Sequence, residues 1–139
     1  MARADRFTEL TNKDEIYSDF LVNLNPHPVS GVLLRFVNEK AVTRSIRNII
    51  LTNRGERLYQ PDLGSDIRSL LFEPMSTFTA NVLRKTIEDA ITKYEPRAKV
   101  INVQVDPYED TNRYVVTIVY MLINKTDPIS VNVTLQRVR

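Results

Sequence analysis

Cysteine is absent from this chain of 139 residues, and it contains a single histidine and no tryptophan. Without cysteine the chain can form no disulfide, no thiolate zinc site and no thiol nucleophile. The one histidine, His27, lies between two prolines, so a multi-histidine metal site is excluded and a Ser-His-Asp triad would depend on that residue. We interpret His27 as a turn residue and expect neither a metal nor a cofactor.

Glycine occurs three times, at positions too far apart for the glycine-rich loops that hold phosphate groups. No apolar run approaches the roughly eighteen residues of a membrane span, and the N-terminus lacks the apolar stretch of a secretion signal. With 42% hydrophobic and 26% charged residues, the composition is that of an ordinary globular domain. We expect one domain and no membrane partner.

Nineteen basic and seventeen acidic residues give a net charge of +2, which does not by itself indicate nucleic-acid binding. The excess of basic residues is largest between positions 35 and 57, which contain six basic and two acidic residues. No nucleic-acid module accompanies them, so we interpret this segment as a solvent-exposed charged face and expect no nucleic-acid partner. Its prominent arginines are Arg44, Arg47, Arg54 and Arg57.

The first 40 residues differ in pattern from the rest of the chain. Residues 1–15 are polar with alternating charge signs, which is typical of an arm or a short docked segment. Residues 16–36 alternate between apolar and polar on both sides of a turn at 25–31, and this predicts a pair of strands. We therefore divide the chain into an N-terminal part, 1–40, and a main domain, 41–139.

Helical spacing of apolar residues predicts three helices in the main domain. The first covers residues 39–51, and a short second one, capped by Ser65 or Asp66, ends by Phe72 before a proline. The third and clearest begins after a cap at Ser76 or Thr77 and stops before Pro96. Its predicted apolar stripe consists of Ala80, Leu83, Ile87, Ala90, Ile91 and Tyr94.

After Pro96 the apolar period changes from that of a helix to that of a strand. Residues 100–105, 114–123 and 129–136 are predicted strands separated by turns, and the middle one, apolar on both faces, should be central and well covered. Helices followed by such strands indicate an α+β fold, with helices packed on an antiparallel β-meander in a single domain.

With thiol and multi-histidine chemistry excluded, a carboxylate pair of the glycoside hydrolase type is the remaining enzymatic route. Glu73 and Glu95 each precede a proline beside apolar residues, so burial could raise the pKa of either carboxyl group. No motif pairs them, and a sugar-binding cleft lined by tryptophan is excluded. We name no catalytic residue and expect a protein that is not an enzyme, with a glycan-cleaving enzyme as the alternative.

Glu95, Pro96 and Arg97 join the longest predicted helix to the strand that follows it. In a structural interpretation Pro96 ends the helix, Glu95 is solvated and Arg97 pairs with the last helical carbonyl groups. In a functional interpretation the proline ring holds two opposite charges at a fixed separation for a partner protein. The residues alone are compatible with both.

Four blocks in order resemble the baseplate wedge and sheath-initiator family of contractile phage tails, to which a type VI secretion baseplate subunit is related. The blocks are TNRGER at 52–57, PDLGSDI at 61–67, LFEPM at 71–75 and YEPR at 94–97, followed by the β-meander. The resemblance covers residues 42–137 and leaves the first 40 residues unmatched.

The resemblance implies a structural subunit of the virion baseplate, made in the host cytoplasm and present in six copies around the tail axis. Its implied partners are the wedge proteins, the tail sheath protein and the tail tube or hub. Glu95, Pro96 and Arg97 are then expected to bind the wedge core. The last strand, expected at a sheet edge, would seed strand exchange with the sheath. The residues expected to carry that exchange are Ile129, Val131, Val133 and Leu135. The family has also carried a lysozyme-like label, which matches the enzymatic alternative.

Overall fold

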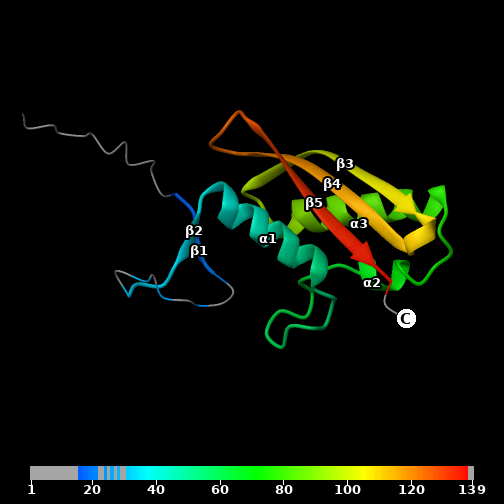
Figure 1. Ribbon diagram of the computed structural model, residues 1–139, viewed down its shortest axis with the longest axis horizontal. Helices are drawn as coiled ribbons and strands as arrows, with labels where there is room; N and C mark the ends of the chain where they lie inside the picture. The colour runs from blue at the N-terminus through cyan, green and yellow to red at the C-terminus, as the bar shows by residue number, and fades with distance from the viewer. Residues whose placement is uncertain (1–15, 22–23, 25, 27, 29–30, 138–139) are drawn as a thin grey trace, which may run out of the picture. The chain divides into compact units, whose positions relative to one another are not determined.

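The computed structural model describes residues 16–21, 24, 26, 28 and 31–137 (Figure 1). The chain divides after Ala41 into two compact units. In the first unit β1 (Ser18–Phe20) pairs antiparallel with β2 (Arg35–Val37). This confirms the predicted strand pair, although each strand is only three residues long. The predicted arm at 1–15 and the predicted turn residue His27 lie outside the described residues.

The second unit contains the elements that carry the rest of the argument. Helix α1 (Glu39–Leu51) spans the division between the units, and α2 (Ile67–Leu70) and α3 (Thr77–Tyr94) follow it. Strands β3 (Ala98–Tyr108), β4 (Arg113–Leu122) and β5 (Pro128–Gln136) form an antiparallel sheet in the order β3-β4-β5, with the short 3-10 helix η1 (Glu109–Thr111) between β3 and β4. The α+β fold with an antiparallel meander is therefore confirmed.

Helix α1 has the predicted bounds because its apolar residues fall on one face. Val42, Ile46 and Ile50 of that stripe are all at most 2% exposed. Arg47 is exposed, as predicted for the opposite face, whereas Arg44 is half-buried. A long arginine side chain can lay its methylene groups along apolar surface, which explains how Arg44 loses exposure on the polar side of the helix.

Helix α3 begins at the predicted cap, since the Ser76 hydroxyl accepts a hydrogen bond from the Thr79 N–H at 3.1 Å. Of the two caps expected for α2, Asp66 occupies the N-cap position but its side chain makes no capping bond. Ser65 is not the cap, and its hydroxyl donates to the Ile50 carbonyl at 3.0 Å. Ser65 therefore joins the end of α1 to the start of α2, and α2 ends at Leu70 rather than at Phe72.

The helices cover only one face of the sheet. Alternate residues of β4 are buried beneath them, and a hydrogen bond of 2.8 Å joins the hydroxyl groups of Thr43 in α1 and Tyr120 in β4. Helix α3 packs along β3, behind the sheet in Figure 1. The other face of β4 is half-buried, so the strand is central as predicted but is covered from one side only. The buried residues of β4 are Tyr114, Val116, Ile118, Tyr120 and Leu122.

Strand β5 shows the predicted alternation. Its odd-numbered residues from Val131 to Leu135 are buried, while Ser130, Asn132 and Thr134 are exposed on the outer face of the sheet. The strand pairs with β4 alone among the described strands, so it lies at an edge of the sheet, as does β3. None of the helices in the described ranges has the length and apolar character needed to cross a bilayer.

Candidate partner-binding sites

The junction between α3 and β3 is built on a buried ion pair. Glu95, the C-cap residue of α3, is only 2% exposed, and Arg97 follows it after one proline. Both carboxylate oxygens of Glu95 are engaged: Arg97 donates from Nε to Oε1 at 2.5 Å and from Nη2 to Oε2 at 2.7 Å. This bidentate geometry holds the arginine across the end of the helix.

The Glu95 carboxylate is ionised in this setting. Burial alone would raise the pKa of Glu95, but hydrogen bonds from Arg97 and Ser45 and the charge of Arg97 outweigh it and lower the pKa below its ordinary value. The expectation that burial raises this pKa is therefore wrong, because the same fold that buries the carboxylate also supplies its donors. Ser45 belongs to α1, so the carboxylate links α1, α3 and the start of β3.

The two sequence interpretations of this corner are both modified by the geometry. Glu95 is not solvated, and its charge is directed to Arg97 rather than outward. The surface of the corner consists of Pro96, which is exposed, and of the Arg97 side chain, which is 36% exposed. A partner at this corner would therefore meet the proline ring and the outer side of the guanidinium.

The edge of β5 presents a defined set of backbone groups. The Arg137 N–H donates to the Asn112 carbonyl at 3.2 Å, and the same register pairs Leu135 with Tyr114 and Val133 with Val116. In an antiparallel ladder hydrogen-bonded and non-hydrogen-bonded pairs alternate, so the odd-numbered residues of β5 bond to β4. The backbone groups that point away from β4 belong to Ser130, Asn132, Thr134 and Gln136.

The four residues expected to carry strand exchange do not lie at the hydrogen-bonding edge of β5. Val131, Val133 and Leu135 are at most 9% exposed in the core of the domain, and Ile129 is half-buried. Their backbone groups also belong to the set that pairs with β4. They therefore stabilise the strand, while its even-numbered residues supply the hydrogen-bonding edge.

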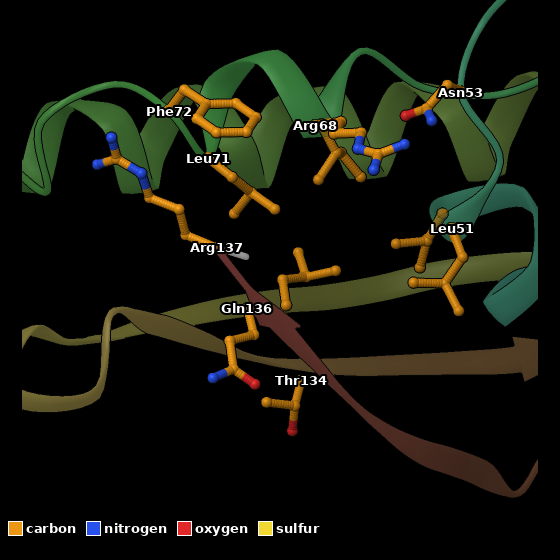
Figure 2. Close-up of a pocket in the computed structure, with 11 residues that line it drawn as sticks. Leu51, Asn53, Arg68, Leu71, Phe72, Thr134, Gln136 and Arg137 are labelled. Atoms are coloured by element: carbon orange, nitrogen blue, oxygen red, sulfur yellow. The ribbon is translucent and has the colours of Figure 1, made fainter. Parts of the chain in front are cut away.

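A groove of about 200 Å³ opens beside the C-terminal end of β5 (Figure 2). Leu51 at the end of α1, with Leu71 and Phe72 just after α2, form apolar walls, and residues 134–137 form the opposite side. The Arg137 guanidinium lies 5.4 Å from the centre of the Phe72 ring, and Arg68 also lines the groove. The groove is thus apolar between two cations, and it adjoins the hydrogen-bonding edge of β5.

The two carboxylates singled out from the sequence have opposite surroundings. Glu95 is buried, and Glu73 is exposed. Among the residues that the structure describes, no group of three or more histidine, cysteine, aspartate or glutamate residues could hold a metal ion. An ionised Glu95 with both oxygens bound to arginine has no proton to donate to a glycosidic oxygen.

Comparisons with known proteins point in one direction. Residues 37–127 match the family described as baseplate wedge protein gp25. The baseplate wedge protein gp25 of Enterobacteria phage T4 is 31% identical over 120 residues, which cover 86% of this chain and 90% of the phage protein.

Solved structures share the fold. A Geobacter sulfurreducens protein named as a candidate tail lysozyme matches with a TM-score of 0.68 and 26% identity, over 73% of this chain and 92% of that one. A chain of the anti-feeding prophage baseplate matches with a TM-score of 0.68 and 24% identity, over 80% and 89% of the two chains. For a chain of the type VI secretion baseplate complex the TM-score is 0.53 at 21% identity, over 69% and 92%.

The Glu95 ion pair should make stability depend on pH in a defined direction. The pKa of Glu95 is lower in the folded chain than its ordinary value of 4.5, so its stabilising effect is complete above that value and is lost as the pH falls through the folded pKa. We expect Glu95→Gln to lower the free energy of unfolding by about 2 kcal/mol at neutral pH, because the charge left on Arg97 is 36% exposed and partly solvated. The difference in the free energy of unfolding between wild type and variant should become smaller below pH 4.5.

Urea denaturation at a series of pH values measures this difference. Glu88→Gln, a change at an exposed carboxylate of α3, is the matched control and should alter stability by less than about 0.5 kcal/mol. A Glu95→Gln effect that stays constant from neutral to strongly acidic pH would show that the carboxylate charge is not what stabilises the junction.

Proposed function

We propose that this chain, which belongs to the baseplate wedge protein gp25 family, starts the contractile sheath by offering the free edge of β5 to a strand of the first sheath subunit. The chain is a structural component of a contractile-tail baseplate and assembles with other baseplate proteins. The observation that carries the proposal is the edge itself: the backbone groups of Ser130, Asn132 and Thr134 point away from β4.

Strand addition suits this edge physically. An added strand gains main-chain hydrogen bonds, and its alternate side chains provide specificity. On the helix-covered side, those side chains would extend toward the groove bounded by Leu71, Phe72 and Leu135. On the outer side they would lie beside the polar side chains of Asn132 and Thr134. The edge therefore offers both the hydrogen bonds and an asymmetric pair of faces.

Proline at an edge-facing position tests the strand-exchange proposal. Asn132→Pro removes an N–H that points away from β4, so the β4–β5 ladder keeps its bonds while the edge loses a donor. We expect baseplates that carry this variant to form but to nucleate sheath at least tenfold less often, as counted by electron microscopy of assembled tails. Asn132→Ala, which keeps the donor, should nucleate normally.

Circular dichroism must show that both variants are folded. Sheath of normal length and frequency on Asn132→Pro baseplates would mean that β5 only completes its own domain.

We further propose that Pro96 and the exposed side of Arg97 dock on the helical core of the wedge, with Glu95 holding the arginine in place. The pair is rigid before binding, because Glu95 fixes the guanidinium with two hydrogen bonds, so little side-chain entropy is lost on docking. The exposed side of a guanidinium held in this way would donate to a carboxylate, or to the carbonyl groups at a helix C-terminus, of a partner.

The docking test must separate binding from folding, since Arg97→Ala would leave the Glu95 carboxylate buried and unpaired. Replacing the whole pair, as Glu95→Gln with Arg97→Met, removes both charges and leaves no unpaired ion. We expect this double variant to stay folded and to bind purified wedge proteins at least tenfold more weakly. Lys99→Met, which removes an exposed cation nearby on β3, is the control. Wild-type binding by the double variant would place the docking point elsewhere.

Six copies around the tail axis, synthesis in the host cytoplasm and contacts with the tail tube or hub complete the proposed role. The location in the tail baseplate follows from the family. The sixfold number is supported by the sixfold symmetry of the anti-feeding prophage baseplate, which contains a chain of the same fold.

We also propose that the chain is not a glycan-cleaving enzyme, although one relative of the same fold is named as a candidate tail lysozyme. The absence of an available proton on Glu95, whose ionised carboxylate accepts two hydrogen bonds from Arg97, supports a non-enzymatic role, as does the exposure of Glu73. Purified protein should leave a suspension of peptidoglycan as turbid as buffer does, beside a lysozyme as positive control. Clearing that disappears in Glu73→Gln or Glu95→Gln would identify an active carboxylate and contradict the proposal.

A further inference from the structure

The loop that joins α1 to α2 is closed at its base. The Ser65 N–H donates to the Thr52 carbonyl at 3.0 Å, and Asn53 and Ser65 form an isolated parallel bridge. Gly64 has a φ of +125°, and a Cβ at this position would lie 2.5 Å from the Thr52 carbonyl oxygen. The two ends of the loop are therefore pressed together, in the manner of an Ω-loop.

The body of the loop is also fixed by hydrogen bonds. The Gly55 N–H donates to the Pro61 carbonyl at 2.8 Å, and the Asn53 N–H donates to the Glu56 carboxylate at 2.9 Å. The Tyr94 hydroxyl of α3 donates to the Asp62 carbonyl and so connects the loop to that helix. These contacts leave residues 56–60 as a short tip, which we call the loop tip, held on a constrained base.

The loop tip exposes its apolar residues almost completely. Leu58 is 95% exposed and Tyr59 is 98% exposed, more than any other large apolar residue among those that the structure describes. Arg57, beside them, is exposed and takes part in no ion pair with the residues that the structure describes. Ω-loops normally pack their own side chains inward, whereas here the apolar ones point away from the loop and add nothing to its stability.

We propose that residues 57–59 form a docking knob that inserts into an apolar pocket with an acidic rim on a neighbouring baseplate protein. Tyrosine and arginine are the residue types that most often dominate interface energetics, and leucine supplies apolar area beside them. Because the base of the loop is already ordered, binding orders only the tip side chains. The proposal rests on membership of the baseplate family and is independent of strand exchange at β5.

The groove beside β5 in a second copy of this chain is a poor receptor for the knob. The groove beside β5 is lined by Leu71 and Phe72, but the cations Arg68 and Arg137 border it. Arg57 of an incoming knob would meet charge of its own sign there, and like charges in a contact oppose binding. The pocket beside α3 is lined by Asp66 and Asp89 but also by Arg54 and Lys93, so its rim is not acidic either. Charge complementarity therefore favours a different protein, with carboxylates around its pocket.

Variants of the tip test the knob in the complete chain. Leu58→Ser with Tyr59→Ser removes the apolar anchor, and Arg57→Glu reverses its charge. Both should remain folded, since the altered side chains are exposed. The variants are supplied to baseplates that assemble in the absence of the wild-type chain. We expect each variant to be incorporated at least tenfold less than the wild-type chain. Phe78→Ser, which removes an apolar side chain 74% exposed on α3, is the matched control and should incorporate normally.

A photocrosslinking amino acid at position 59 identifies the receptor. Crosslinks to one apolar site flanked by Asp or Glu on another baseplate protein support the proposal. Crosslinks to a second copy of this chain overturn it, as does wild-type incorporation of the two tip variants. Binding of the free chain to anionic lipid vesicles that is lost in the Leu58→Ser, Tyr59→Ser variant would also overturn it, by assigning the tip to a membrane surface. Circular dichroism and thermal melting at wild-type values are required of every variant.

Discussion

Within the second unit, the described helices cover one face of the β3-β4-β5 sheet and not the other, and this one-sided packing determines which surfaces of the unit remain for assembly. Alternate residues of β4, from Tyr114 to Leu122, are buried under α1 and α3 and form the centre of the core. Within the described residues of the second unit, no helix or strand lies over the opposite face or along the outer edge of β5. The apolar core between the helices and one face of the sheet is sufficient to stabilise the unit. An additional strand could therefore pair with the edge of β5 without a rearrangement of that core.

Directional contacts fix how the helices meet that sheet. The Glu95 carboxylate brings together Ser45 of α1, the end of α3 and Arg97 before β3, while Thr43 bonds to Tyr120 in β4. Apolar packing alone is tolerant of small slides, whereas bidentate and hydroxyl contacts are not. The corner at Pro96 and the edge of β5 are therefore held in a constant relation within the second unit, as the proposed docking of a different partner at each would require.

Local patterns predicted most of the fold because the core has simple periodicities. The bounds of α1, the Ser76 cap of α3 and the alternation of β5 all follow from residue spacing, and the structure confirms them. The side-chain caps expected at Ser65 and Asp66 do not form because each side chain has another partner. The Ser65 hydroxyl bonds to Ile50, fifteen positions earlier in the chain, and the Asp66 carboxylate pairs with Arg54 at 3.2 Å. The choice of these partners depends on how α1 and α2 lie together, which spacing does not contain.

The candidate sites were less accessible to such reasoning. A carboxylate before proline is equally compatible with solvation and with burial, so the Glu95–Arg97 pair emerged only from the three-dimensional contacts. Alternation in β5 predicted which side chains enter the core, but which backbone groups face the edge depends on the ladder register with β4. The exposure of Leu58 and Tyr59 likewise arises from the closure of their loop by Ser65 and Gly64.

The central claim is that β5 receives the first sheath strand, and a cryo-electron microscopy map of the baseplate–sheath junction tests it most directly. The account predicts a strand of the adjacent sheath subunit beside β5, with main-chain hydrogen bonds to Ser130, Asn132 and Thr134. A map in which the sheath subunit contacts only helices, or in which the edge of β5 faces solvent while the sheath is in place, would contradict it.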